Sequence, residues 1–414
     1  MPKISSFKSR VIINSRGEKT IESEIKINES KGRYSSPSGA SKGTFEAPSF
    51  PNGGINQSKK LLDNEIAPKL LNFDFSSQSE IDTLLRTIDG SNNYSRIGGS
   101  ASLSISLAVA EAAAKNQGIP LYNWILKNPP THMPLPLGNI IGGGSHSLGQ
   151  ACDIQEFLAV PLNPSSFKDS VFALISLHRE VGEILINTDE FFLGGRNDEG
   201  AWCSSLHEDD ILTALSEAIN NIKKQTGIKF GIGLDIAAGT LWNQNTRTYS
   251  YKRTNMTRNR DDQIEYILNL IKKYDLLYVE DPLHDQDFPG FTEITQKTKN
   301  TLICGDDLYV TSVSRLGLGA REKAGNSVII KPNQVGDLTG SQEAADIATQ
   351  NGFKIIVSHR SGETPTSHLA HIALGLNAIM IKTGVMGGER VIKLNELIRL
   401  EEELKANIKM SKLS

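Results

Sequence analysis

Short apolar runs rich in β-branched residues recur through the C-terminal two-thirds of the chain, and amphipathic helical stretches separate them. The runs span residues 154–160, 231–236, 276–279, 302–304, 327–330, 354–357 and 378–381. The helical patterns between them include 260–273, 314–323, 341–350 and 367–376. Apolar strands that alternate with helices are typical of parallel strands buried on both faces. Because there are more units than a small doubly wound sheet holds, the pattern predicts an α/β fold with a (βα)8-type barrel domain over residues 127–414.

The first 126 residues have a different pattern. Two β-rich stretches, 9–14 and 20–28, flank a turn at Ser15-Arg16-Gly17 and predict an antiparallel strand pair. A loop rich in glycine, serine and proline follows at 35–43, and its composition fits either a mobile functional lid or an ordinary connection. Helical patterns then lie at 58–71, 79–87 and 101–117. We therefore expect a smaller α+β domain at residues 1–126, with a linker at 127–130.

The composition excludes several classes of protein. Forty-four basic and forty-seven acidic residues give a net charge of −3, which does not indicate binding to nucleic acid or to an anionic membrane. Three cysteines without CxxC spacing make no disulfide framework and fit a reducing compartment. The start, MPKISSFKSR, lacks the apolar stretch of a signal peptide, and no apolar run approaches the ~20 residues of a membrane span. We expect a soluble cytoplasmic enzyme; a second presence at the cell surface or outside the cell is left open.

A charged residue follows nearly every apolar run in the second half of the chain. These residues are Asp235, Glu280, Asp306, Lys331, His359 and Lys382. A single Asp in such a place is ordinarily the N-cap of the next helix, and a single Lys or His is ordinarily solvated. Lys331 and Lys382 cannot cap a helix, however, and all six residues occupy the same position in successive units. Because the C-terminal ends of barrel strands converge on one mouth, we expect these side chains to form one site.

The types of residue at these positions indicate a chemistry. Three carboxylates on adjacent strand ends suit a hard dication such as Mg²⁺, whereas no set of Cys and His residues has the spacing of a zinc site. Positive charge close to a lysine depresses its pKa, so Lys331 or Lys382 can serve as a neutral base. A base beside a dication suits removal of a proton α to a carboxylate, because the metal stabilises the enediolate that forms.

The sequence around these positions carries a more specific resemblance. The chain resembles the enolase family over nearly its whole length, in segments that occur in one order and at compatible spacing. They are 14–17 (NSRG), 37–41 (PSGAS), 139–146 (NIIGGGSH), 155–157 (QEF), 198–200 (DEG), 233–235 (GLD), 279–282 (VEDP), 305–308 (GDDL), 331–335 (KPNQV), 358–364 (SHRSGET), 381–384 (IKTG), 389–390 (ER) and 393–404 (KLNELIRLEEEL).

The resemblance implies a role for each matching residue. Asp235, Glu280 and Asp306 match the ligands of a first Mg²⁺, and Ser41 matches a residue that helps to bind a second. Lys331 matches the base that removes the C2 proton. Glu199 matches the acid that protonates the departing hydroxyl, supported by Glu156. The matching substrate contacts are Gln155, Arg360, Ser361 and Lys382, while His146 and His359 match two active-site histidines whose individual roles stay open.

The resemblance also implies the reaction and the assembly. The expected reaction is the Mg²⁺-dependent, reversible dehydration of 2-phospho-D-glycerate to phosphoenolpyruvate in glycolysis and gluconeogenesis, with two Mg²⁺ ions per active site. Glu199 can act as an acid near neutral pH if burial or the neighbouring Glu156 raises its pKa. The family is at least dimeric, so we expect a homodimer or a higher homo-oligomer. Arg16 and Glu22 match an interface with Glu402 and Arg399 of the second copy.

The chain departs from the common family pattern at a few positions. Asn14 replaces the usual Asp, Lys42 replaces a common Thr, Ala-Trp-Cys-Ser occupies 201–204 in place of Gly-Phe-Ala-Pro, and Pro-Thr occupies 365–366 in place of an acidic pair. None of these is a predicted ligand or part of the acid–base pair. They bear on loop motion, substrate affinity and surface contacts. Residues 381–389 (IKTGVMGGE) are more similar to archaeal enolases.

Other functions fit the sequence less well. A different acid dehydratase or isomerase on the same barrel would lack the 358–361 segment and the Ser41 loop. A binding or structural protein that kept only the fold would be expected to lose Lys331, Glu199 or a metal ligand, and all are present. Nucleotide binding is disfavoured, since the glycines at 142–144 form neither GxGxxG nor a Walker loop.

Overall fold

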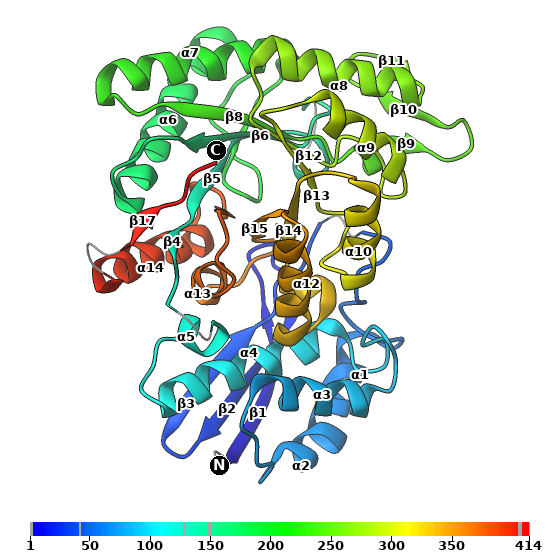
Figure 1. Cartoon of the computed structure of the whole chain (residues 1–414), viewed down its shortest axis with the longest axis vertical. Coiled ribbons are helices and arrows are strands. Elements are labelled where there is room, and N and C mark those ends of the chain that lie inside the picture. The colour runs from blue at the N-terminus through cyan, green and yellow to red at the C-terminus, as the bar shows by residue number, and fades with distance from the viewer. Residues whose placement is uncertain (1–2, 41–42, 127–128, 148–150, 405–407, 414) are drawn as a thin grey trace.

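The chain forms a small N-terminal α+β part and a larger C-terminal barrel that lie one above the other (Figure 1). The structure, a computed structural model, describes residues 3–40, 43–126, 129–147, 151–404 and 408–413. In the described part of the chain, no helix is long and apolar enough to cross a membrane. The expected fold class is confirmed, as the following elements show.

A three-stranded antiparallel sheet, covered by helices, makes up the N-terminal part. The predicted strand pair is present. The first strand is longer than expected, since β1 spans Ile4–Ile13, while β2 spans Lys19–Ile27, one residue from the predicted range. The sequence analysis missed the third strand, β3 (Ser30–Ser35), because SKGRYS has no apolar alternation. Gly32 in β3 lets the sheet approach the helix above it, since a Cβ there would lie 2.0 Å from the carbonyl oxygen of Ala108.

The helices of this part follow the apolar pattern with one irregularity. The helix expected at 58–71 starts earlier and contains a π-helical turn at Leu62–Ile66, between α1 and α2. The buried helix expected at 101–117 is α4, whose serines and alanines let it pack against β2 and β3. The bounds are α1 Gly54–Leu61, α2 Ala67–Leu70, α3 Gln78–Asp89, α4 Gly99–Asn116 and α5 Leu121–Ile125.

Eight strands close into the barrel. Their order is β5-β6-β8-β12-β13-β14-β15-β16, and β16 pairs with β5 to complete the circle. The interior is filled by apolar side chains such as Leu158, Ile329 and Ile356, each 0% exposed. The bounds are β5 Leu135–Gly142, β6 Glu156–Pro161, β8 Phe230–Asp235, β12 Tyr278–Glu280, β13 Leu302–Gly305, β14 Ser327–Ile330, β15 Lys354–Ser358 and β16 Met380–Lys382.

Helices surround the barrel, and short strands extend it. The helices are α6 Phe167–Thr188, α7 Glu208–Thr226, α8 Arg260–Tyr274, α9 Phe288–Lys297, α10 Val313–Glu322, α11 Pro332–Val335, α12 Leu338–Gln350, α13 His368–Gly375 and α14 Gly388–Leu404. The additional strands are β4 His132–Met133, β7 Trp202–Cys203, β9 Trp242–Asn243, β10 Thr248–Tyr251, β11 Met256–Arg258 and β17 Lys409–Met410.

Two features of the barrel differ from the sequence-based prediction. The first strand, β5, was missed, because its sequence LPLGNIIG contains a proline and two glycines and does not read as a strand. The expectation of parallel strands throughout is wrong at β6, which runs antiparallel to both β5 and β8. The described residues of the connection, 143–147 and 151–155, contain no long helix, and β6 runs back along β5 instead of following a crossover.

The strand ends converge as predicted. Glu156, Asp235 and Glu280 are register neighbours across β6, β8 and β12. Glu156 is the first residue of its strand, but the reversed direction of β6 places it at the same rim as the last residues of the other two. Ser358 and Lys382 are paired in the same way across β15 and β16.

Buried charges join the two parts of the molecule. Asp337, the N-cap of α12, accepts hydrogen bonds from Arg86 of α3 at 2.8 and 2.9 Å and from the hydroxyl of Tyr94. Asp82 of α3 accepts from the backbone N–H and the hydroxyl of Thr339, at 2.9 and 2.6 Å. Burial, reinforced by the charge of Asp337, raises the pKa of Asp82 to about 7.

The raised pKa of Asp82 predicts a pH-dependent stability. A carboxyl group titrates near pH ~3.9 in an unfolded chain, so the stability gained from a protonated Asp82 is complete below that pH and is lost as the pH rises through about 7. The loss has an upper limit of about 4 kcal/mol. Asp82→Asn, a neutral mimic, should therefore reduce the fall in unfolding midpoint between pH 5 and pH 8.

Thermal unfolding of the parent and the variant at both pH values measures this effect. Glu343→Gln is a matched control, because Glu343 lies beside Arg86 but its side chain is 51% exposed. An identical pH response in the parent and Asp82→Asn would contradict the prediction.

Candidate active site

One pocket at the rim of the barrel gathers most of the residues that the sequence predicted. Residues from β6, β8, β15, β16 and the connecting loops line it. The lining residues are Gly39, Ala40, His146, Gln155, Glu156, Glu199, Asp235, Asp306, Lys331, Ser358, His359, Arg360, Ser361 and Lys382. Glu280 is fully buried and contacts this set through Lys382. Ser41 lies outside the described residues, as does Lys42.

Two buried lysines lie among the carboxylates of the predicted metal site. The ammonium of Lys382 is 3.0 Å from Asp235 Oδ2, 2.7 Å from Glu280 Oε2 and 3.3 Å from a carboxylate oxygen of Glu156. The ammonium of Lys331 is paired with Asp306. Burial lowers the pKa of each lysine, but the carboxylates outweigh it and hold both pKa values above the ordinary range.

The oxygen atoms at this end of the pocket fit a hard dication. Glu280 Oε1 is buried and has no hydrogen-bond partner among the described residues. Burial and the charge of Asp235 raise the pKa of Glu280 to about 7, and burial and the charge of Asp306 raise the pKa of Asp307 to about 8. Such crowding leaves negative charge that a divalent cation would balance, and all the donors are oxygens, as Mg²⁺ prefers.

The closest grouping of these oxygens differs from the predicted trio. Ligand atoms of Asp281, Asp306 and Asp307 lie within 4.8 Å of one another. Asp235 and Glu280 are instead bridged by the Lys382 ammonium. The carboxylate of Asp281 also accepts hydrogen bonds from the backbone N–H groups of Asp306 and Asp307, at 3.1 and 2.8 Å, and so fixes the turn after β13.

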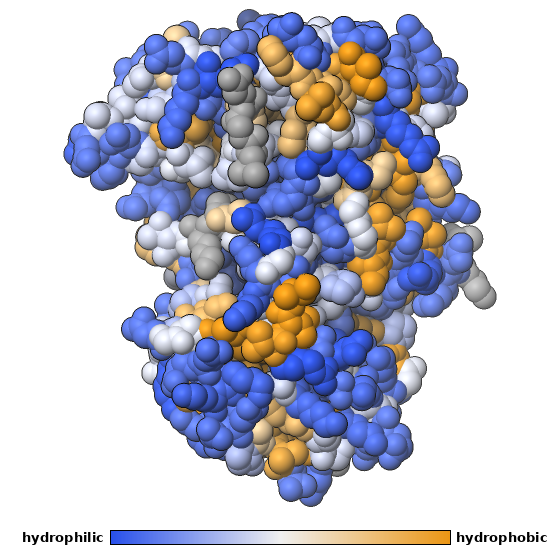
Figure 2. All heavy atoms as spheres, turned by 180° about the vertical axis from the view of Figure 1, so that it is seen from behind, coloured by the Kyte–Doolittle hydropathy of each residue, from blue (hydrophilic) through white to orange (hydrophobic). Residues whose placement is uncertain are grey.

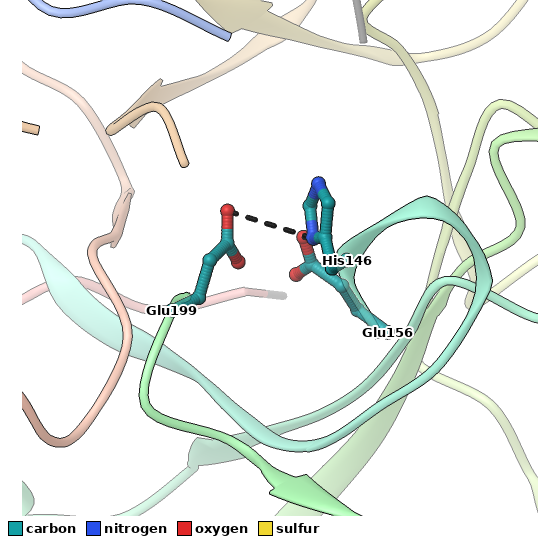
Figure 3. Close-up of side chains that lie close together, drawn as sticks. All are labelled: His146, Glu156 and Glu199. Atoms are coloured by element: carbon teal, nitrogen blue, oxygen red, sulfur yellow. Dashed lines mark ion pairs between the residues drawn. The ribbon is translucent and has the colours of Figure 1, made fainter. Parts of the chain in front are cut away.

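A second acidic centre lies near Lys382 in the same pocket. His146, Glu156 and Glu199 point toward one another from three segments (Figure 3). His146 Nδ1 is 3.6 Å from Glu156 Oε1 and 3.7 Å from Glu199 Oε1. Burial and the charge of Glu199 hold the pKa of Glu156 well above its usual range.

Glu199 has the opposite shift, which differs from the expectation that its pKa is raised. Burial acts to raise the pKa of Glu199, but His146 and His359 outweigh it, so the pKa lies well below the ordinary value. His359 Nε2 is 3.5 Å from Glu199 Oε2, and the amide of Asn139 donates to the same oxygen at 3.1 Å. The two neighbouring carboxyl groups therefore have opposite shifts, which favour the protonated form of Glu156 and the charged form of Glu199.

The predicted substrate contacts lie around these two centres. Gln155 donates to Asp235 at 3.2 Å. Arg360 makes a two-pronged pair with Glu46, at 2.9 and 3.1 Å, which is the geometry that a guanidinium also offers to a phosphate. The hydroxyl of Ser361 accepts from the backbone N–H of Ala40 at 2.6 Å, so the loop after Pro37 contacts the segment after β15.

Several residues that support the site were not assigned by the sequence analysis. Gln334 donates to Asp306 at 2.8 Å, and Asn333 accepts from Arg360 at 3.2 Å. Both follow Lys331 within residues 331–335, a segment whose only predicted significance was its resemblance to the family. Glu46 gave no signal, because it lies in an irregular segment far from any predicted strand end. Arg390, also quoted only as part of a segment, contacts His359.

The described departures from the family pattern lie outside the pocket lining. Asn14 organises the turn before β2 and donates to Ser38 at 2.8 Å. Trp202 stacks on His178 behind the Glu199 loop. Pro365 is exposed and Thr366 is partly exposed. None of these four residues lines the pocket.

The sequence is similar to known proteins along nearly its whole length. Residues 130–412 match the family described as "Enolase, C-terminal TIM barrel domain", and residues 4–125 match the one described as "Enolase, N-terminal domain". A protein named Enolase from Methanosphaera stadtmanae is 42% identical over 402 residues, which cover 97% of each chain. Enolase of Pyrobaculum aerophilum is 42% identical over 407 residues, again 97% of each chain.

A third relative agrees with these two. Enolase of Archaeoglobus fulgidus is 41% identical over 393 residues, which cover 95% of this chain and 96% of the relative. All three relatives are archaeal, in line with the likeness noted at residues 381–389. Both parts of the chain are thus matched, and the chain belongs to the enolase family of hydro-lyases, the phosphopyruvate hydratases.

Proposed function

We propose that this chain catalyses the Mg²⁺-dependent, reversible dehydration of 2-phospho-D-glycerate to phosphoenolpyruvate, in the cytoplasm, as part of glycolysis and gluconeogenesis. One observation carries the proposal: acidic oxygens, two lysines and a buried carboxyl pair all meet in one pocket with an arginine. The substrate has a carboxylate and a phosphate, and the product differs from it by one proton and one hydroxyl. The pocket contains groups suited to bind the carboxylate and the phosphate, to accept the proton and to protonate the departing hydroxyl.

Asp235, Glu280 and Asp306 would hold a first Mg²⁺, and Ser41 would contribute to a second. When bound, the ions stabilise the negative charge that develops on the substrate carboxylate as the C2 proton leaves. The proposed Mg²⁺ site is supported by the crowded, buried carboxylate oxygens of this chain, including Oε1 of Glu280, which has no hydrogen-bond partner among the described residues. Zinc fits less well, because only one histidine and no cysteine belongs to either group of ligand atoms found in the described residues.

Lys331 is the proposed base. A base must be neutral, and here the charge of Asp306 raises the pKa of Lys331 against the effect of burial. Once the charges of Asp306 and Glu280, both proposed metal ligands, are balanced, burial and the nearby Arg360 and Lys382 remain. Each of these lowers the pKa of Lys331. The lysine can then accept the C2 proton near neutral pH.

Glu199 is the proposed acid, with Glu156 as its partner. The pair holds one proton, and that proton must reach the departing hydroxyl through Glu199. Glu156 would carry this proton before the transfer, because burial and the charge of Glu199 hold the pKa of Glu156 high. Arg360 and Ser361 would bind the phosphate, while Gln155 and Lys382 would contact the substrate near its carboxylate.

We also propose that the chain forms a homodimer or a larger homo-oligomer. Figure 2 shows apolar side chains gathered in patches on an otherwise hydrophilic face. The edge strand β1 exposes Val11 and Ile13, at 40% and 68%. Within one chain, Arg16 pairs with Asp198, and Glu22 pairs with Arg10 and Arg33, so both would have to exchange partners to contact Glu402 and Arg399 of a second copy.

A direct assay tests the proposed reaction. The parent should form phosphoenolpyruvate from 2-phosphoglycerate only when Mg²⁺ is present. Lys331→Ala should lower kcat by roughly 10²–10⁴-fold, the contribution of a general base. Lys272→Ala, at an exposed position of α8, is the control and should leave the rate unchanged. Full activity in Lys331→Ala would remove the base assignment, and an inactive parent would favour another dehydratase or isomerase reaction.

Removal of a metal-site carboxylate should weaken metal binding. Asp306→Asn leaves the shape of the side chain but removes its charge, so the Mg²⁺ concentration needed for half-maximal binding should rise by at least about tenfold. Calorimetric titration with Mg²⁺ measures this directly. The exposed Asp346→Asn is the matched control. Equal affinity in Asp306→Asn and the parent would count against this site.

The oligomer proposal has its own test. Arg399→Glu reverses the charge of an exposed side chain on α14 and should shift the protein toward smaller species, because it places like charges at the proposed contact. Sedimentation velocity of parent and variant at the same concentration measures the change. A parent that is monomeric, or a variant with an unchanged distribution, would rule out the proposed contact.

A further inference from the structure

A fully buried arginine on α14 connects the segments on which Glu199 and His359 lie. Arg390 is 0% exposed. Its Nη1 atom is 2.8 Å from His359 Nδ1 and 2.5 Å from the carbonyl oxygen of Arg360. Its Nη2 atom donates to the carbonyl oxygens of Ser361 at 2.7 Å and Asp198 at 2.9 Å. One guanidinium thus holds the loop before Glu199 and the loop after β15 against each other.

The contact with His359 has a chemical consequence. A guanidinium has only donors and stays protonated in proteins. The Nδ1 atom of His359 must therefore accept the hydrogen bond, so it carries no proton. In a neutral imidazole the single ring proton then lies on Nε2, and Nε2 is the atom that faces Glu199 Oε2 at 3.5 Å.

We propose that Arg390 is a positioning residue that fixes His359 in the neutral tautomer with its proton on Nε2, so that His359 serves the pocket as a hydrogen-bond donor and not as a proton acceptor. This assigns a role to a histidine whose role the sequence left open. The tautomer itself does not depend on the reaction; only its effect on turnover rests on the proposed function.

The surroundings of Glu199 agree with this assignment. The amide of Asn139 donates to Glu199 Oε2, and His146 lies beside Oε1. His359 Nε2 is buried and makes no hydrogen bond among the described residues, so a proton on it is free to be donated toward the charged Glu199 carboxylate, whose pKa is low. Burial also lowers the pKa of His359 to about 4, so the ring is neutral at physiological pH.

A neighbouring lysine provides a control that distinguishes an effect on the His359 tautomer from simple anchoring of the loop. Lys393 lies one turn further along α14 and is 1% exposed. It donates to the carbonyl oxygens of Thr364 and Glu389, at 3.1 and 2.8 Å, and pairs with Glu363 at 2.9 Å. Lys393 therefore holds the end of the same loop with a buried charge, and its hydrogen bonds and ion pair with the described residues do not involve His359. Its variant is the matched control.

The tautomer can be observed in the intact protein. Nuclear magnetic resonance of protein labelled with ¹⁵N-histidine reports which ring nitrogen carries the proton, and the chain has only eight histidines to resolve. The His359 signals are assigned by their loss in His359→Gln. We expect an unprotonated Nδ1 and a protonated Nε2 in the parent at neutral pH. A proton on Nδ1, or a doubly protonated ring, would overturn the proposal without any variant.

Variants then test whether Arg390 is the cause. Arg390→Met removes the donor and should give a mixture of His359 tautomers, whereas Arg390→Lys keeps one donor and should restore the Nε2-protonated form. Lys393→Met should leave the His359 spectrum unchanged. A His359 spectrum in folded Arg390→Met identical to that of the parent would overturn the role of Arg390. If Arg390→Met does not fold, Arg390→Lys decides: retention of the Nε2-protonated form there supports the contact, and its loss in folded Arg390→Lys would overturn it.

Kinetics give an independent readout. Arg390→Met should lower kcat on the order of 10–100-fold, the range for a residue that orients a functional side chain, with a smaller change in KM. Arg390→Lys should recover part of the loss. If the parent has the expected tautomer but forms no phosphoenolpyruvate, the proposed function fails and this inference stands. If the parent is active and its His359 carries the proton on Nδ1, the inference fails alone.

Discussion

The rest of the structure depends on the pairing of buried carboxylates with buried cations at the rim of the barrel. The single side chain of Lys382 contacts three carboxylates, those of Asp235, Glu280 and Glu156. Lys382 is almost fully buried, and Glu280 is fully buried. An isolated charge in such a place would cost several kcal/mol, so each charge is tolerable only because others surround it. Closure of the barrel supplies this arrangement, because it brings residues from separate strands to one rim.

Groups that do not line the pocket hold the pocket residues in place. Asp281 holds the backbone after β13, Gln334 orients Asp306, and Arg390 holds the loops that carry Glu199 and His359. The N-terminal part contributes Glu46, which pairs with Arg360, and Ala40, which contacts Ser361. The small domain therefore completes one side of the pocket, and its buried contact through Asp82 and Asp337 fixes its position on the barrel.

The fold and the grouping of the charged residues could be predicted where they arise from local pattern. Apolar strands and the charged residues that end them are visible in the sequence, and the closed barrel brings Asp235, Lys331 and Lys382 into one pocket as expected. The antiparallel β6 could not be predicted in this way, because strand direction is set by the connection on either side and not by the strand. β5 was hidden by its proline and glycines.

The supporting residues were harder to predict for a different reason. Glu46 and Arg390 act through contacts between segments that are far apart in the chain. Nothing near Glu46 marks it, and the likeness at 389–390 did not indicate a contact with His359. The proton distribution in the Glu156–Glu199 pair also required three-dimensional positions. It depends on two histidines and an arginine that approach Glu199 from other elements, and these reverse the shift that burial alone would give.

The central claim is that oxygens from separate strands bind one divalent ion at this rim. Diffraction from crystals grown with Mn²⁺, an anomalous scatterer that takes the same oxygen ligands, tests it most directly. We predict an anomalous peak within about 2.2 Å of carboxylate oxygens of Asp235, Glu280 and Asp306, with the Lys382 ammonium displaced from between the first two. A peak bound elsewhere, or no peak at this rim at saturating Mn²⁺, would contradict the account.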